Sequence, residues 1–300
     1  MKKILSLIML LPALCMQAVT MPTLKGESLP DTDGIHVNAH GGNIIKIGDT
    51  FYWYGEQRGD GSPGSFQQGV SCYTSTDLKT WRNHGTVLSV NDREGDPLEQ
   101  GCLLERPKVV YCPATGKYVL WFHHELKGRG YGAAQAGVAE ADGPLGPFKL
   151  LKTARVNPGY FPLDMTDEQK QMTHPTGLEW WTPLWRQHVT DGMFNLRDMP
   201  GGQMARDMTI YIDDDGRAYH IFASEENLTL NIAELDETFT RHTGRYWRVA
   251  PGGQNEAPTI FKKDGTYWMI TSGCTGGAPN AARMRKAKSI TGPWEQLPNP

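Results

Sequence analysis

Residues 255–271 read NEAPTIFKKDGTYWMIT, and this pattern decides the fold because it recurs along the chain. It consists of an apolar strand, a turn that contains glycine, and an aromatic strand. Glycine favours such hairpin turns because it adopts positive φ without a steric cost. The other copies are HGGNIIKIGDTFYWYGE (40–56), ERPKVVYCPATGKYVLWF (105–122) and RDMTIYIDDDGRAYHIF (206–222).

A second hairpin follows each copy, with a strand ahead of a polar turn. These segments are SCYTSTDLKTW (71–81), AGVAEADGPLGPF (136–148), NIAELDETF (231–239) and RKAKSITGPW (285–294). Two hairpins form a four-stranded blade, and repeated blades predict an all-β propeller with four recognisable blades. We interpret the acidic run at 213–216, DDDG, as a hairpin turn, because it lacks the ligand spacing of a calcium loop.

Closure of this propeller leaves two alternatives. The fourth blade ends at GPWEQLPNP (292–300), and residues 21–38 are too short to form another blade. Either the ring closes with four blades, or the sequence is a fragment whose last blade is missing. We expect the second, with a propeller domain over residues 21–300.

Charge and composition exclude two classes of partner. The 300 residues carry 30 Lys and Arg against 33 Asp and Glu, a net charge of -3. Such a chain has no basic field to attract nucleic acid or an anionic membrane. A neutral or weakly charged ligand, such as an oligosaccharide or polysaccharide, is the better expectation.

The first 20 residues predict a signal peptide. Lys2 and Lys3 precede an apolar run over residues 4–14, which is too short to span a bilayer. We therefore expect a secreted or periplasmic protein. Cys15 suggests lipid attachment as an alternative, but the bulky Leu14 before it disfavours a lipoprotein.

Four cysteines remain after the signal peptide: Cys72, Cys102, Cys112 and Cys274. Without any CxxC spacing, they do not predict a zinc site. We expect four buried thiols, and a disulfide between the second and third is the alternative.

An insertion without the repeat separates the second and third blades, at about residues 153–204. It contains Trp180, Trp181 and Trp185. A loop of this length in a compact domain is usually functional. The tryptophans therefore predict either one wall of a saccharide site or anchors that hold the loop on the propeller.

Three copies of the repeat carry a carboxylate at its start: Glu105, Asp207 and Glu256. Equivalent positions on the inner strands face one axis, so we expect these side chains to converge within about 10 Å of each other. Paired acids suit hydrolysis of a glycosidic bond, which by inversion needs a protonated acid and a second group about 6.5–9.5 Å away. The remaining copy has Gly41 and Gly42 where an acid could stand.

The surroundings of Glu256 suit a general acid. Ala257 and Pro258 follow it and keep its environment apolar and rigid. Desolvation raises the pKa of a carboxyl group, and the neighbouring charge of Asp207 raises it further.

The motifs resemble glycoside hydrolase family 43, a family of five-bladed propellers that are inverting glycosidases on arabinose, xylose and galactose linkages. The resemblance is carried by AHGGNIIKIGDTFYWYGE, ERPKVVY, ARDMTIYIDDDGRAYHI with SEEN behind it, and NEAPTIFKKDGTYWMITSGCTG. Within the family, the chain is most similar to exo-β-1,3-galactanases and their relatives. This implies a galactan 1,3-β-galactosidase-like enzyme acting on plant polysaccharide side chains.

The resemblance implies a role for each matching residue. The general acid falls on Glu256, in Glu-Ala-Pro where the family has Glu-Gly-Pro, and the aspartate that orients this acid falls on Asp207. Glu105 completes the catalytic set as a residue that grips the terminal sugar. The remaining sugar-binding positions are His40, Glu56, Glu226, Asn227 and Thr275.

The usual base is absent from this sequence. The family has His-Asp-Pro in its first blade, and this chain reads His40-Gly41-Gly42. The galactanase-like members are similar in lacking this aspartate, and in them a glutamine on the fifth blade is thought to position the water.

Two other functions stay open beside the galactosidase. One is an α-L-arabinofuranosidase of the same family, and the other is a non-catalytic sugar-binding propeller that lost its base. Neither the galactosidase nor the arabinofuranosidase is expected to require a cofactor, although some family members hold calcium in the central channel. We expect no metal ligands among the site residues.

Overall fold

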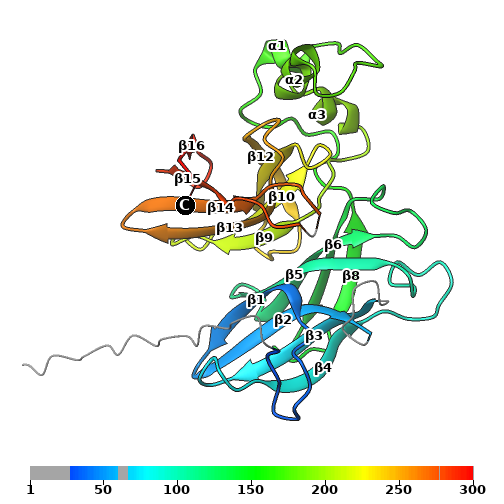
Figure 1. Ribbon diagram of the computed structural model, residues 1–300, viewed down its shortest axis with the longest axis vertical. Helices are drawn as coiled ribbons and strands as arrows, with labels where there is room; N and C mark the ends of the chain where they lie inside the picture. The colour runs from blue at the N-terminus through cyan, green and yellow to red at the C-terminus, as the bar shows by residue number, and fades with distance from the viewer. Residues whose placement is uncertain (1–27, 60–66, 277, 300) are drawn as a thin grey trace, which may run out of the picture.

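The computed structural model describes residues 28–59, 67–276 and 278–299, and it has an all-β architecture with a small helical insertion (Figure 1). Its strands form four antiparallel sheets of four strands each, and each sheet is one repeat of the sequence. The predicted hairpins are confirmed by the pairing of each apolar strand with the aromatic strand that follows it.

The first blade contains β1 (His40–Ile47), β2 (Thr50–Arg58), β3 (Gln67–Ser75) and β4 (Arg82–Ser89). The second contains β5 (Leu103–Cys112), β6 (Lys117–Glu125), β7 (Gln135–Ala141) and β8 (Lys149–Ala154). The third contains β9 (Met208–Ile212), β10 (Ala218–Ser224), β11 (Thr229–Leu235) and β12 (His242–Val249). The fourth contains β13 (Glu256–Lys263), β14 (Thr266–Ser272), β15 (Arg283–Ala287) and β16 (Glu295–Gln296).

Turn chemistry sets the register of these hairpins. Ile47 pairs with Thr50 across a two-residue turn, and Gly48 in that turn has a φ of 57°. The DDDG run forms the turn between β9 and β10, as predicted, and Lys262 and Tyr267 of the fourth blade contact its Asp213.

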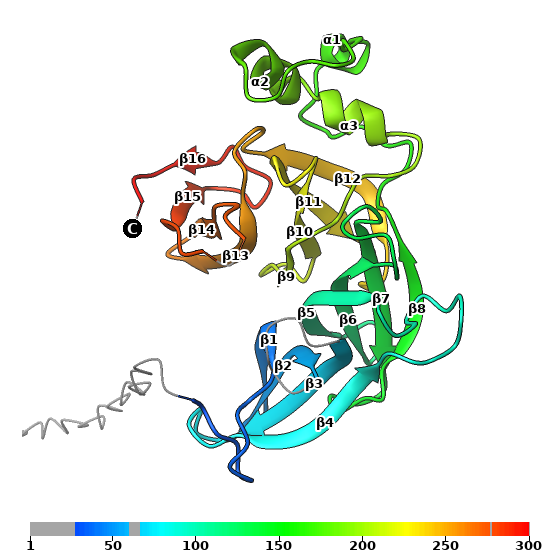
Figure 2. The same cartoon turned by 45° about the vertical axis from the view of Figure 1, so that its right-hand side comes forward.

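The blades follow one another along an arc, with their inner strands β1, β5, β9 and β13 packed in that order (Figure 2). A hydrophobic cluster fills each of the three interfaces between adjacent blades. Leu104 and Val109 pack against the first blade, Trp121 against the third, and Ile221 against the fourth. Within the described residues, no comparable packing joins β13 to β1. The fifth blade expected from the sequence stays a prediction.

The insertion forms three short helices: α1 (Asp167–Lys170), α2 (Pro183–Thr190) and α3 (Met193–Asp198). Sequence periodicity did not predict them. The helix α2 begins at a proline. The residue before it, Thr182, caps the helix, because its hydroxyl accepts a hydrogen bond from the backbone N–H of Trp185. The side chain of Trp185 is fully buried, which fixes the helix on the propeller.

The four cysteines after the signal peptide are free thiols. Cys72, Cys102 and Cys112 are buried as expected, but Cys274 is only partly buried. The predicted signal peptide, with Cys15, lies outside the described residues. No helix that the structure describes is long and apolar enough to cross a membrane.

Candidate active site

A cavity of about 420 Å³ lies at the start of the four inner strands. Four carboxylates line it: Glu56, Glu105, Asp207 and Glu256. Its other polar lining residues are His40, Arg58, Arg106, His123, Tyr131, Arg206 and Asn227. The carboxylates that open three copies of the repeat therefore reach the same cavity.

Backbone bulges deliver side chains from three blades to this point. The pairing register shifts directly after His40 in β1, after Glu105 in β5 and after Glu256 in β13. The residue that follows each of them has a positive φ, including the non-glycine residues Arg106 (53°) and Ala257 (47°). A bulge bends the strand and re-aims its side chains, and here it does so at equivalent positions.

The bulge in the first blade leaves no room for an acidic side chain at Gly41 or Gly42. A β-carbon on Gly41 would lie 2.8 Å from Glu56 Oε1 and 3.2 Å from the Arg106 side chain. A β-carbon on Gly42 would overlap the Tyr54 carbonyl oxygen. Glu56 thus occupies the space into which an aspartate at position 41 would project.

We expect that an aspartate introduced at position 41 will not act as a catalytic base. Gly41→Asp should lower the thermal stability and should not raise kcat, because it adds a second carboxylate beside buried Glu56 at a φ of 65°. The left-handed conformation alone costs about 1–2 kcal/mol for a non-glycine residue. Gly41→Ala separates the steric effect from the charge. A Gly41→Asp variant with faster turnover would contradict this account.

Glu56 is held as a buried anion. Its Oε1 accepts a hydrogen bond from the Arg106 N–H (3.0 Å), and its Oε2 lies 3.2 Å from Arg58 Nη2 and 3.4 Å from His40 Nδ1. Burial alone would raise the pKa of Glu56, but the hydrogen bonds from His40 and from the Arg106 N–H outweigh it and lower the pKa. The carboxylate is therefore ionised and rigid.

Glu105 is supported by a buried histidine. His123 places Nδ1 3.2 Å from Glu105 Oε2 and Nε2 2.8 Å from Glu125 Oε1. The Tyr131 hydroxyl donates to Glu105 Oε1 at 3.0 Å. Burial opposes the ionisation of both Glu105 and His123. Their contact with each other outweighs burial, so the pKa of Glu105 is lowered and the pKa of His123 is raised. Glu125, on the other side of the imidazole, adds to the rise in the pKa of His123.

Asp207 and Glu256 form the opposite side of the cavity. Asp207 Oδ2 accepts a hydrogen bond from the Ala257 N–H (2.9 Å) and forms an ion pair with Arg106 Nη2 (2.9 Å). Asn227 Nδ2 donates to Glu256 Oε1 at 3.0 Å. Burial, followed by the charge of Asp207, raises the pKa of Glu256. The cavity thus holds one carboxyl group with a raised pKa, Glu256, beside two with lowered pKa values, Glu56 and Glu105.

Cys274 is a neighbour of Glu256 that the sequence did not identify as a site residue. Burial and the Glu256 carboxylate raise the pKa of its thiol to about 12, so it stays protonated. Its Sγ lies 3.9 Å from the Asn227 carbonyl oxygen.

Two predicted sugar-binding residues, Glu226 and Thr275, do not line the cavity. Glu226 forms ion pairs with Arg197 (3.0 Å) and with Arg206 (3.2 Å), and only Arg206 of these three residues lines the cavity. Thr275 is also outside the lining, and its hydroxyl donates to the Ala278 carbonyl oxygen. His40 lines the cavity, but its side chain is 67% exposed.

The cationic half of the site was missed in the sequence. Arg58, Arg106, Arg206 and His123 carry no motif of their own, and they are spread over three blades. One signal was present: Arg106 directly follows Glu105 in the repeat. His123 could have been found only through its pairing with Glu105 in the register of β5 and β6.

The tryptophans of the insertion do not line the acidic cavity. Trp185 acts as an anchor, whereas Trp180 and Trp181 are half-exposed. The insertion nevertheless lies at the acidic end of the propeller. Leu228 belongs to the same buried cluster as Trp185, and it directly follows Asn227.

A metal ion finds no obvious ligand set here. In residues 28–59, 67–276 and 278–299, no three His, Cys, Asp or Glu side chains are grouped as a metal site. A buried cation of the chain itself lies beneath the cavity: Lys108 Nζ contacts the carbonyl oxygens of Gly41 (2.7 Å) and Arg106 (3.1 Å). Burial, followed by the charge of Arg106, lowers the pKa of Lys108 to about 7. Calcium in the central channel stays a prediction.

Comparisons with known proteins find relatives of this chain in sequence and in fold. The sequence model of a family described as glycosyl hydrolases family 43 matches residues 183–300. A solved family 43 β-1,3-galactosidase, in complex with galactodeoxynojirimycin, is 53% identical with a TM-score of 0.89. That match covers 92% of this chain and 80% of the galactosidase.

Two further relatives are longer than the present chain. An exo-β-1,3-galactanase from Clostridium thermocellum is 35% identical with a TM-score of 0.71, and the match covers 91% of this chain but 51% of that one. A curated β-D-galactofuranosidase from Aspergillus niger is 32% identical over 98 residues, which are 32% of this chain and 28% of the relative. The chain therefore spans about half of the galactanase and matches just over a quarter of the galactofuranosidase.

Proposed function

The chain belongs to glycoside hydrolase family 43, and we propose that it is an exo-acting β-1,3-galactosidase that releases terminal galactose with inversion. The solved galactosidase that resembles it most among those described above binds galactodeoxynojirimycin, which supports galactose as the sugar in the cavity. The proposed substrates are galactans and their oligosaccharides.

One observation carries this proposal: four carboxyl groups line one cavity, and three of them differ in the direction of their pKa shifts. The pKa of Glu256 is raised, and the pKa values of Glu56 and Glu105 are lowered. Hydrolysis needs such a division, because one group must donate a proton while its neighbours remain charged.

We assign proton donation to Glu256. Asn227 orients its carboxyl group, and Asp207 raises its pKa while Arg106 and the Ala257 N–H hold that aspartate in place. The proton passes from Glu256 to the glycosidic oxygen as the bond to the anomeric carbon breaks.

We assign sugar binding to Glu105 and Arg58, which lie 3.7 Å apart in the cavity. An ionised carboxylate accepts hydrogen bonds from sugar hydroxyls, and the guanidinium donates to them. Glu56 is almost fully buried, and its Oε2 holds Arg58 in place through a contact with Nη2.

The attacking water needs a partner on the face opposite Glu256. Gly41 stands at the position of the family's aspartate base, and Glu56 and Glu105 are held by cationic neighbours. We propose that an amide group positions the water, as the resemblance to the galactanase-like members implies.

The test is turnover of β-1,3-linked galactobiose with identification of the first anomer by NMR. Inversion predicts α-galactose as the initial product, because the substrate bond is β. Release of β-galactose would contradict the inverting mechanism. Hydrolysis of α-L-arabinofuranosides alone would favour the arabinofuranosidase. Binding of galactan without any turnover would favour the non-catalytic propeller.

The pH dependence provides a prediction for Asp207. Because Glu256 must be protonated, activity should fall as the pH rises through its pKa. Asp207→Asn removes a charge that raises this pKa, so the alkaline limb of kcat/KM should move to lower pH. The measurement is the pH profile of both proteins. An alkaline limb that does not move, or that moves to higher pH, would exclude this electrostatic role.

We also propose that the protein is exported through the signal peptide at residues 1–20. The support is the sequence pattern of two lysines followed by an apolar run. The N-terminal sequence of the protein recovered from outside the cytoplasm tests it, and an uncleaved N-terminus would contradict it.

A further inference from the structure

A lysine is buried beside the acidic cavity, on the inner strand β5. The side chain of Lys108 is only 7% exposed, and within the described residues its ammonium forms no ion pair with a carboxylate. Lysine side chains are almost never buried in this way unless they are paired. Lys108 does not line the cavity, and the proposed chemistry assigns it no role.

Three backbone carbonyl oxygens surround this ammonium in place of a carboxylate. Lys108 Nζ donates to the carbonyl oxygens of Gly41 (2.7 Å) and Arg106 (3.1 Å), and that of Pro107 lies 3.4 Å away. An ammonium has three N–H donors and no acceptor, so it can serve all three oxygens at once. A methionine of similar length would have no donor for any of them.

The first two carbonyl groups belong to the bulges of two different blades. In β1 the pairing register shifts after His40, and Gly41 has a φ of 65°. In β5 the register shifts between Glu105 and Lys108, and Arg106 has a φ of 53°. A non-glycine residue at positive φ persists only where its surroundings hold it. The ammonium joins the two bulges, because it contacts one carbonyl group from each.

Arg106 connects Lys108 to two carboxylates of the cavity. Its backbone N–H donates to Glu56 Oε1 at 3.0 Å, and its Nη2 lies 2.9 Å from Asp207 Oδ2. The bulge aims both the N–H and the side chain of this arginine. Both contacts therefore require the bulge in β5 to keep its shape.

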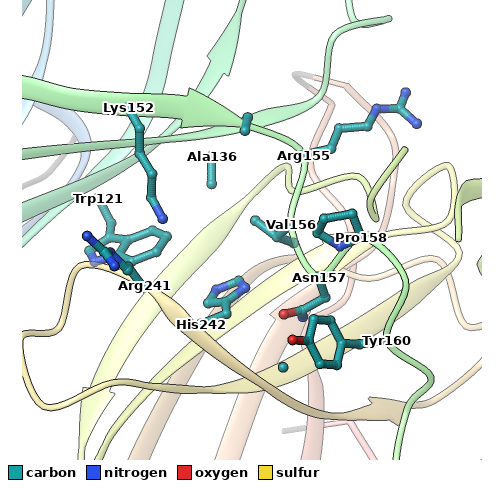
Figure 3. A pocket seen from close by; sticks show the side chains of 12 residues that line it. Trp121, Ala136, Lys152, Arg155, Val156, Asn157, Pro158, Tyr160, Arg241 and His242 are labelled. Atoms are coloured by element: carbon teal, nitrogen blue, oxygen red, sulfur yellow. The ribbon is translucent and has the colours of Figure 1, made fainter. Parts of the chain in front are cut away.

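A second lysine of the same blade lies in different surroundings. Lys152 is exposed on the outer strand β8, and Figure 3 shows its side chain at a cavity of about 230 Å³ between the second and third blades. This cavity shares no lining residue with the acidic cavity. Lys152→Met is therefore a matched control, since it removes a lysine charge from the second blade away from the proposed active site.

We propose that Lys108 is a positioning residue of the active site, whose ammonium holds the bulges of the first and second blades together. It touches neither the substrate nor the reacting atoms, and it acts through Arg106. Without the ammonium, the carbonyl groups of Gly41 and Arg106 are released, and Glu56 and Asp207 lose a fixed partner. The effect on turnover rests on the proposed function, whereas the effect on the Arg106 N–H does not.

The first experiment measures amide hydrogen exchange in the wild type and in Lys108→Met. Burial lowers the pKa of Lys108 to about 7, so the measurements are made at about pH 6, where the ammonium predominates. The Arg106 N–H should exchange about tenfold faster or more in the variant, because its bulge opens more readily. The N–H of Gly116, in the turn at the other end of β5, should keep its wild-type rate.

Two results of this experiment would overturn the proposal. One is an unchanged exchange rate of the Arg106 N–H in Lys108→Met. The other is an equal acceleration at Gly116, which would indicate general destabilisation. Lys152→Met should leave both rates unchanged.

The second experiment is chemical rescue of turnover. Lys108→Ala should lower kcat on galactobiose by about 10–100-fold, because displacement of a catalytic group by about 1 Å costs on the order of 10²-fold. The n-propylammonium ion matches the deleted part of the side chain, so it should restore part of the rate. The neutral 1-propanol has a similar shape and should not. Lys152→Met should keep the wild-type kcat.

Equal rates in the wild type and Lys108→Ala, or equal rescue by both compounds, would overturn the proposal. Where Lys108→Ala does not fold, Lys108→Gln takes its place. Glutamine keeps two N–H donors, so its kcat should lie between those of the wild type and Lys108→Met. A Lys108→Gln protein no more active than Lys108→Met would contradict the role of the donors. A wild type without turnover would contradict the proposed function and leave the exchange experiment intact.

Discussion

Glu256→Gln is expected to lower kcat by about 10²–10⁴-fold, the usual contribution of general acid catalysis, with a larger loss for a poor leaving group. Glutamine keeps the shape of the side chain and can still accept the hydrogen bond from Asn227 Nδ2. It cannot donate a proton to the glycosidic oxygen. Sugar binding should therefore survive, and the loss should appear in kcat rather than in affinity.

Two measurements separate this role from a structural one. The dissociation constant for galactose should change little in Glu256→Gln, while galactobiose hydrolysis is nearly abolished. Glu295→Gln is the control, because its carboxylate is 63% exposed on the fourth blade. A substrate whose leaving group needs no proton, such as an activated aryl galactoside, should recover part of the lost rate. A Glu256→Gln variant that keeps a third of the wild-type rate on galactobiose would exclude Glu256 as the acid.

The hairpins were predictable because their information is local. Each glycine-containing turn, such as the one at Gly48, joins two strands whose pairing follows from the turn alone. The convergence of Glu105, Asp207 and Glu256 on one cavity follows from the same repeat, since equivalent positions of packed blades face one axis.

The rest of the site depends on contacts that are distant in sequence. His123 resembles a core residue of an apolar strand until its register places it opposite Glu105. Arg106 bridges two blades because a bulge gives it a positive φ, and bulges leave no clear mark in a single sequence. The short helix α2 could not be predicted from the sequence for a related reason: burial of Trp185 stabilises it, rather than a periodic pattern of apolar residues.

Arg248→Met is expected to destabilise the fold by about 3–5 kcal/mol, because it leaves the buried carboxylate of Glu225 without its partner. Arg248 Nε and Nη2 contact the two oxygens of Glu225 at 2.7 and 2.8 Å. The same guanidinium donates to the carbonyl oxygens of Val189 and Thr190 at the end of α2. One side chain thus joins the helical insertion to the turn between β10 and β11.

That turn also connects the insertion to the proposed catalytic acid. Glu225, Glu226 and Asn227 all have positive φ values, between 52° and 64°. Such a backbone persists only where its surroundings hold it. The ion pair of Glu225 holds one end, and the burial of Leu228 beside the insertion holds the other. Between them, Asn227 reaches Glu256.

Arg248→Met should therefore lower kcat as well as stability, and the two effects can be separated. Chemical unfolding gives the first, and galactobiose hydrolysis well below the unfolding transition gives the second. The double variant Glu225→Gln/Arg248→Met removes both charges, so it should regain part of the lost stability. Its kcat should stay low, because a neutral pair no longer anchors the turn that carries Asn227. A double variant with wild-type kcat would show that the insertion only packs against the third blade and has no part in positioning the acid.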